Sequence, residues 1–212
     1  EFEQGQKELE NCPWTVKRLL MTKEVWLLAI SNSYLFAVAS GMMGTMIPRL
    51  LSTGRYSPDQ AMVFLMIAAF SACPGSWLCG FIDQKTSPKT ALIFTNICCT
   101  IACILNIIPT LPTLIISLVF IGIGTGGSAN FIMSMTSEYF GRFKFQKAYP
   151  TILTLNQLIG SGGPMLMAVV AAHMNWDVSY IVMCILGIVA TLVALPIKNG
   201  FVEKAEARFE KQ

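Results

Sequence analysis

Charged residues divide this chain into long uncharged stretches. No Asp, Glu, Lys or Arg occurs at positions 25–48, 60–82, 90–137, 148–176 or 178–197. A helix needs about 20 mostly apolar residues to cross a bilayer. The run 90–137 is therefore long enough for two crossings, and Pro109 and Pro112 divide it. The pattern predicts six membrane-spanning helices, near residues 25–48, 60–82, 90–108, 113–137, 148–172 and 178–197.

Composition agrees with a lipid environment. Of the 212 residues, 54% are hydrophobic and 13% are charged, whereas soluble domains carry roughly 25% charged residues. In hydrocarbon the backbone amides must be satisfied within the protein, which favours helices for these spans. We therefore predict an all-α, polytopic membrane protein. It consists of a cytoplasmic segment with an interfacial helix (1–24), a six-helix transmembrane domain (25–197) and a cytoplasmic tail (198–212).

Basic residues fall almost entirely on one side of this predicted topology. Six crossings place both termini on the same side, and thirteen of the 15 Lys and Arg residues then lie there, leaving Arg49 and Arg55 on the other. Such a bias places the basic side in the cytoplasm. We expect a multi-pass protein of the cell membrane with both termini in the cytoplasm. Orientation accounts for the basic clusters, so they give no indication of nucleic-acid binding.

The two ends of the chain are expected to lie at the membrane surface or in water. The segment from Pro13 to Leu20 predicts a short interfacial helix, with Trp14 among the lipid headgroups. The tail from Val202 to Gln212 alternates Glu with Lys or Arg, which predicts a solvated helix or a disordered segment.

Cysteine and histidine spacing gives no sign of a metal site. None of the seven cysteines forms a CxxC pair, and the one histidine, His173, is not beside any of them. Structural zinc sites need such clustered ligands. We expect no metal ligands and no cofactor.

Glycine marks two of the predicted spans. Gly122 and Gly126 have GxxxG spacing in the fourth span, and Gly163 precedes Pro164 in the fifth. Small residues let helix backbones approach closely where lipid provides no hydrophobic drive. The sequence leaves open whether these helices only pack tightly or also bend during a functional cycle.

Three segments resemble motifs of the major facilitator superfamily. Residues 80–85 (GFIDQK) resemble its loop between the second and third helices of a half. Residues 138–142 (EYFGR) resemble its loop between the fourth and fifth helices, and residues 163–164 (GP) are similar to its fifth helix. The resemblance implies the C-terminal six helices of a twelve-helix secondary transporter, a symporter or antiporter. It is nearest to the oxalate/formate antiporter and monocarboxylate transporter type.

The resemblance also implies residues that act in the conformational cycle. Asp83, Lys85, Glu138 and Arg142 occupy the two motif-bearing loops. Asp83 lies at the end of a span, where it can pair with loop cations or with the N-terminus of a neighbouring helix. Such a contact can form in one state and break in the other. The alternative is an ordinary loop acid beside loop lysines.

The resemblance implies that the first, second, fourth and fifth helices of a half face the substrate cavity. Candidates in these spans are Asn32, Phe36, Ser40, Ser71, Thr125, Asn130, Asn156, Gln157 and Ser161. Amides in a membrane are costly unless they find partners or face water. These residues therefore either line the cavity or bond to other helices. By depth we favour Gln157 as the main substrate contact, with Asn156 bonded to a neighbouring helix.

The expected function is alternating-access transport of a small solute. No ionisable residue lies within any predicted span, which disfavours a dianion such as oxalate and favours a neutral solute or a small organic anion such as a monocarboxylate. The expected partners are the solute, the lipid bilayer, and either an N-terminal six-helix half or a second copy of the chain. We expect no nucleic-acid partner.

Two alternatives also fit six membrane helices. A channel or membrane assembly subunit is disfavoured because no filter-like segment or charge ring occurs. An intramembrane serine protease would pair Ser128 with His173. Ser128 lies about 15 residues into its span from the non-cytoplasmic side, roughly 22 Å deep, whereas His173 lies at that outer end of the fifth span. We expect no catalytic residues.

Overall fold

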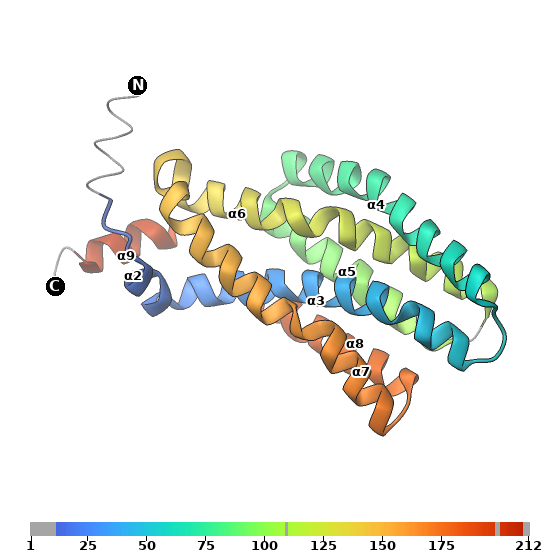
Figure 1. The fold of residues 1–212 in the computed structure, drawn as a ribbon. Helices are drawn as coiled ribbons and strands as arrows, with labels where there is room; N and C mark the ends of the chain where they lie inside the picture. The colour runs from blue at the N-terminus through green and yellow to red at the C-terminus, as the bar shows by residue number, and fades with distance from the viewer. Residues whose placement is uncertain (1–11, 109, 198–199, 210–212) are drawn as a thin grey trace.

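The computed structural model describes residues 12–108, 110–197 and 200–209. All regular elements in these residues are α-helices, which confirms the all-α prediction (Figure 1). They are α2 (Val16–Met21), α3 (Lys23–Ser52), α4 (Pro58–Lys85), α5 (Pro88–Ile107), α6 (Leu111–Gly160), α7 (Gly162–His173), α8 (Trp176–Ala194) and α9 (Phe201–Phe209). Pro109 and the parts of the predicted cytoplasmic segments at 1–11, 198–199 and 210–212 lie outside the described residues.

Five helical stretches in the described residues are long and apolar enough to cross a membrane. Four of them are α3, α4, α5 and α8, and the remaining one runs from Leu111 to His173 through α6 and α7. The predicted spans coincide with these helices to within a few residues. The bounds of the membrane crossings stay predictions.

α6 contains the residues that we expected to form two separate spans. Within it, Gly141 has φ 69° and ψ 173°, a conformation that is not helical, and the chain changes direction there (Figure 1). Glycine adopts positive φ at little steric cost. We call residues 111–140 the first limb of α6 and residues 142–160 the second limb. The sequence predicted a loop over 138–147, but only Gly141 departs from helical geometry.

The predicted fifth span is divided between the second limb and α7. The two helices meet at Ser161, which keeps helical φ −63° and ψ −17° and whose N–H still bonds to the Gln157 carbonyl at 2.9 Å. Pro164 lies in the first turn of α7, and because proline has no N–H it cannot bond to the Gly160 carbonyl one turn earlier. Whether Gly163 and Pro164 bend this helical stretch during a functional cycle stays a prediction.

Local signals explain where several helices begin. Ser57 and Gln60 form a reciprocal capping box at the start of α4, and Pro58 occupies its first turn. The Asn175 side chain accepts a hydrogen bond from the backbone N–H of Val178 at 2.8 Å and caps α8. These caps place helix ends at the predicted non-cytoplasmic side.

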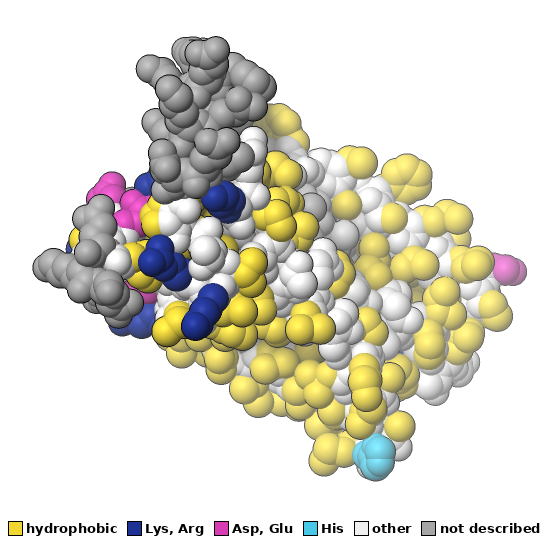
Figure 2. Space-filling model, turned by 60° about the vertical axis from the view of Figure 1, so that its left-hand side comes forward, with side chains coloured by type: hydrophobic (Ala, Val, Ile, Leu, Met, Phe, Trp, Pro, Cys, Tyr) yellow, Lys and Arg dark blue, Asp and Glu magenta, His cyan; other side chains and the backbone are white. Residues whose placement is uncertain are grey.

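The outer surface of the helices is strongly apolar. Phe70, Trp77 and Met165 are 77%, 70% and 73% exposed. Figure 2 shows hydrophobic side chains over most of the visible face, with Lys and Arg side chains gathered at one end of the molecule. This distribution is typical of a protein whose sides contact lipid and whose ends contact water.

Trp14 and α9 pack on the protein, which corrects two expectations. Trp14 is 1% exposed, because its ring packs between Phe140 at 5.0 Å and Phe209 at 5.2 Å between centroids. It therefore does not lie among headgroups. α9 is not a fully solvated helix, since it buries Phe201 and Val202 against the same cluster. The prediction rested on the alternating charges of the tail and did not consider these apolar residues.

Candidate functional site

Close contact between α4 and the first limb of α6 positions several candidates. A Cβ atom at Gly122 would lie 2.3 Å from the Ser71 Cβ, and one at Gly126 would lie 2.2 Å from the carbonyl oxygen of Ala72. No side chain fits at either position without separating the helices. The Ser71 hydroxyl instead bonds to the Ile67 carbonyl at 2.7 Å, so it is satisfied within its own helix.

The open side of this helix pair carries a polar contact. Asn130 is exposed on α6, and its Nδ2 donates to the Ser76 Oγ of α4 at 3.0 Å. Thr125 is half-buried and bonds to the Ile121 carbonyl at 2.9 Å. We did not predict Ser76 as a site residue. Its position one turn beyond Ala72, on the face that meets Gly126, is the signal that could have identified it.

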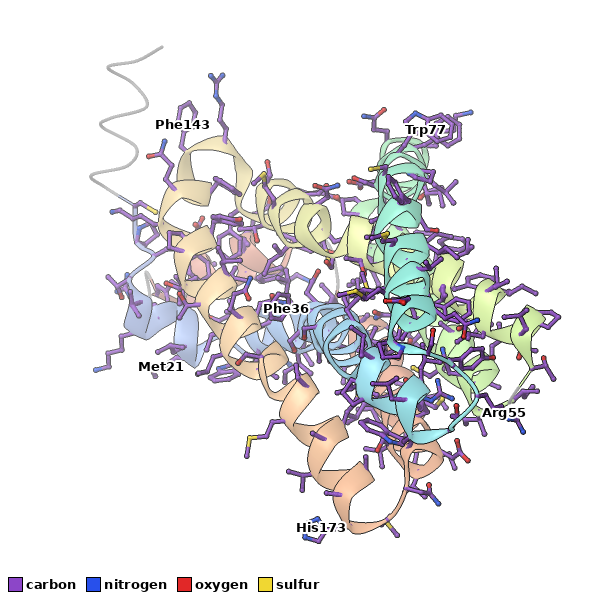
Figure 3. The ribbon with its side chains drawn as sticks, turned by 45° about the vertical axis from the view of Figure 1, so that its right-hand side comes forward. Met21, Phe36, Arg55, Trp77, Phe143 and His173 are labelled. Carbon is purple, nitrogen blue, oxygen red and sulfur yellow. The ribbon has the colours of Figure 1, made fainter. Side chains whose placement is uncertain are left out.

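α3 packs in the same close manner against α7. A Cβ atom at Gly163 would lie 2.2 Å from the Ala37 carbonyl oxygen. Phe36 faces the second limb of α6, since its Cδ1 is 2.7 Å from the Cβ position of Gly160 (Figure 3). Ser40 is half-buried and donates to the Phe36 carbonyl at 2.6 Å.

The structure separates Asn32 from Phe36 and Ser40, although we predicted a shared face. Asn32 is 1% exposed, and its Nδ2 contacts the Leu28 carbonyl at 3.0 Å and the Met135 sulfur at 3.5 Å. Steps of four residues advance by about 40° around an ideal helix. Asn32 is consequently turned toward α6 and into the bundle.

Three polar residues form an exposed stripe on the second limb and its continuation. Thr154, Gln157 and Ser161 follow one another at steps of three and four residues, which places them on one helix face. All three are exposed, whereas Asn156 is 5% exposed. We call Thr154, Gln157 and Ser161 the polar stripe.

Gln157 differs from its two companions in the stripe. The hydroxyls of Thr154 and Ser161 bond to carbonyls of their own helix, at 2.8 and 3.1 Å. Within the described residues, the Gln157 amide has no hydrogen-bond partner. This amide offers two donors and one acceptor, so it is available to water, to a solute or to another protein segment.

The loop candidates form one contact between helices. The Ser134 hydroxyl of α6 donates to Asp83 Oδ2 of α4 at 2.6 Å. The ion pairs among described residues do not include Asp83, so its partner here is a hydroxyl and not the expected loop cation. Lys85 lies over the Phe81 ring at 4.5 Å, and Arg142 is exposed beyond the turn at Gly141.

Glu138 lies one residue beyond the predicted fourth span, on the same side as Asp83. The pKa of the Glu138 carboxyl is raised above its ordinary value. Partial burial is the larger cause and the negative charge of Asp83 the smaller. An acidic side chain of α6 therefore lies near the Ser134–Asp83 bond.

The residues of the protease alternative do not form a dyad. Ser128 Oγ donates to the Thr125 carbonyl at 2.9 Å. His173 lies at the end of α7, where its Nδ1 is 2.9 Å from the Val169 carbonyl oxygen (Figure 3). Each side chain is occupied on its own helix.

Comparison with known families agrees with this architecture. The model of the Major Facilitator Superfamily matches residues 25–211, which is most of the chain, while none of the curated proteins matches it. Members of this superfamily are secondary transporters of small solutes and are not enzymes. The chain belongs to the major facilitator superfamily and is a multi-pass membrane protein of the transporter class.

Proposed function

We propose that this chain is the C-terminal six-helix half of a twelve-helix, alternating-access transporter of the oxalate/formate or monocarboxylate type. Its solute would be a small organic anion such as a monocarboxylate. The observation that carries the proposal is the polar stripe on an otherwise apolar helix. Exposing the Gln157 amide to lipid would be costly, so this face is better suited to a water-filled cavity.

The residues next to the stripe support that orientation. Leu158 is 71% exposed and Met165 is 73% exposed, and each is four residues from a member of the stripe, so exposed apolar side chains lie beside the polar residues on this face. Such a surface suits packing against a second six-helix half, with the polar stripe left facing the space between halves. Transporter substrate sites lie near the bilayer midplane at such repeat interfaces.

The charge of the candidates supports the substrate class. The cavity candidates from α4 and α6, Ser76, Asn130 and Gln157, are all neutral hydrogen-bonding side chains. The predicted spans 60–82 and 148–172 contain no Asp, Glu, Lys, Arg or His. This half would therefore bind a carboxylate by neutral hydrogen bonds, with any counter-charge supplied by the other half. A dianion such as oxalate would be poorly compensated.

The two ends of the described chain support an even number of crossings. α2 and α9 lie together at one end, joined by the hydrogen bond from Trp14 to Glu206 (Figure 1). Dividing α6 at Gly141 turns the five long apolar stretches into six crossing segments. With thirteen cations on this side of the predicted topology, both termini would lie in the cytoplasm of a cell-membrane protein.

Uptake by proteoliposomes containing the complete transporter tests this proposal. We expect radiolabelled lactate or formate to accumulate and oxalate to accumulate much less. A second sample containing only this chain tests the partner, because half of the cavity wall would then be absent and uptake should be lost. Rapid oxalate uptake without monocarboxylate uptake would contradict the substrate class. Uptake by the chain alone would instead indicate that two copies pair.

A further inference from the structure

The end of the bundle opposite α2 and α9 contains a pocket. It is formed where α3 and α5 end and where α6 and α8 begin, and its volume is about 430 Å³. Small-molecule sites commonly occupy roughly 300–1,000 Å³. The lining includes both basic residues that we predict on the non-cytoplasmic side, Arg49 and Arg55. The lining contains none of the polar stripe, so the pocket is separate from the proposed cavity.

Arg49 is held in a defined position in this pocket. Its guanidinium donates to the side-chain oxygen and to the backbone oxygen of Asn106, and its central carbon lies 4.2 Å from the centre of the Tyr180 ring. Asn106 is in turn fixed by a 2.7 Å hydrogen bond to Ser117. A guanidinium has five N–H donors, so these two bonds leave further donors on a rigid group that lines the pocket.

The other charges around the pocket also favour an anion. Arg55 lines it from the connection between α3 and α4 (Figure 3). The N-terminal ends of α6 and α8, at Thr110 and Asn175, add the positive ends of two helix dipoles. One acid, Asp177, is also in the lining. It lies in the first turn of α8 and offsets part of this positive potential.

Apart from the hydroxyls of Ser52 and Thr53, the rest of the lining is mostly apolar. Leu50, Ile108 and Leu114 contribute aliphatic surface, and Tyr56 and Trp176 contribute aromatic surface. A bare inorganic ion would leave this surface without a contact. The combination of two guanidiniums with apolar walls suits an anion that has an apolar body.

We propose that this pocket is an anion-binding site for an amphipathic oxyanion, in which Arg49 and Arg55 hold a carboxylate or phosphate group and the apolar lining holds its body. This chemistry has two sources at a membrane surface: a free organic acid and the headgroup region of an anionic lipid. The site would operate at the non-cytoplasmic mouth of the protein, independently of the central cavity.

Binding of benzoate to the purified chain in maltoside detergent tests the free-acid source. By isothermal titration calorimetry, Arg55→Gln should weaken benzoate binding roughly tenfold or more, because a charge-assisted hydrogen bond is lost. Asp177→Asn should strengthen binding, because the opposing charge is removed. Lys17→Gln is the matched control, since Lys17 is an exposed cation of α2 at the opposite end of the bundle, and this variant should bind benzoate as tightly as the parent protein.

Arg49 needs a variant that separates binding from folding. Arg49→Lys retains the charge but loses the planar fork that bonds to Asn106. A melting curve establishes that the variant is folded, and benzoate affinity should fall in the folded protein. If Arg49→Lys does not fold, the Arg55 and Asp177 variants still decide the proposal. Both residues are exposed, so their substitution should leave the fold intact.

A lipid titration tests the other source. Phosphatidylglycerol or phosphatidylcholine is added to the same detergent solution, and the melting temperature is measured. Stabilisation by phosphatidylglycerol alone that disappears in Arg55→Gln assigns the site to anionic lipid. Benzoate binding with the expected variant order assigns it to a free acid. The proposal is overturned if neither ligand depends on Arg55 and Asp177. Lactate uptake by the complete transporter would be unaffected by that result, so the two proposals fail separately.

Discussion

Trp14 and Glu206 lie 192 positions apart, and the indole N–H of Trp14 donates to Glu206 Oε1 at 2.6 Å. The same carboxylate pairs with Lys144, whose Nζ is 2.6 Å from Oε1. Lys144 lies just beyond the turn at Gly141. Glu206 of α9 therefore connects the segment before α2 with the turn in α6.

We expect Glu206→Ala to destabilise the protein by about 1–3 kcal/mol, because it leaves the buried indole N–H of Trp14 without an acceptor. Thermal unfolding of the purified chain in detergent measures the effect. Glu203→Ala is the matched control, since Glu203 is an exposed acid on the same helix. Equal melting temperatures for the two variants would show that the Trp14–Glu206 bond contributes nothing to stability.

The predicted orientation can be tested by labelling intact cells with a membrane-impermeant maleimide. Thr53→Cys should react from outside, whereas Gln84→Cys and Gln146→Cys should react only after permeabilisation. All three positions are exposed in the structure, so access depends on the side of the membrane. A Cys73→Ser background removes the exposed native thiol. Labelling of position 84 or 146 in intact cells would reverse the topology.

The sequence predicted the helices well because lipid imposes a simple rule. A span must be apolar for about 20 residues, and the charges that bound each uncharged run are visible without a structure. The helix boundary at Ser161 was not predictable in this way. Glycine and proline occur at 160–164, but they are compatible with a continuous bent helix as well as with two helices.

Placement of the candidate site was harder to predict, because periodicity relates residues to one another and not to the bundle. Asn32 and Ser40 were grouped on one face, yet Asn32 is buried against α6 while Ser40 is half-buried. The burial of Trp14 was also not predictable, because its neighbours are distant in the sequence. Its burial depends on Phe140 and Phe209, which no local pattern around Trp14 reveals.

Gly126→Leu should destabilise the protein by about 1–3 kcal/mol or more, because the new side chain overpacks the contact with Ala72 on α4. Gly44→Leu is the matched control. Gly44 is an exposed helical glycine with no atom within 4 Å of its Cβ position. Melting temperatures in detergent distinguish the two. A similar loss of stability in both variants would indicate a general effect of removing glycine and not close helix packing.

Asp83→Asn should lower the transport rate of the complete transporter much more than its apparent substrate affinity. The reason is that Asp83 contacts Ser134 across two helices, about two helical turns along α4 from the cavity candidate Ser76. Ser134→Ala should produce a change in the same direction, because it removes the same contact from the other side. Gln84→Ala, an exposed neighbour, serves as the control. Normal turnover in both Asp83→Asn and Ser134→Ala would leave the contact without a role in the cycle.

The adjacent amides of the second limb provide the sharpest test of the proposed cavity. Successive residues are about 100° apart around a helix, and the structure leaves Gln157 exposed while Asn156 is 5% exposed. Loss of one neutral hydrogen bond costs about 0.5–1.5 kcal/mol, or roughly 2- to 13-fold in affinity. Gln157→Ala should raise the KM for uptake within that range while expression is unchanged, and Asn156→Ala should mainly lower the melting temperature. Gln146→Ala removes another exposed amide, near the start of the same limb, and should alter neither quantity. If Asn156→Ala abolishes binding and Gln157→Ala does not, the cavity faces the opposite side of this helix.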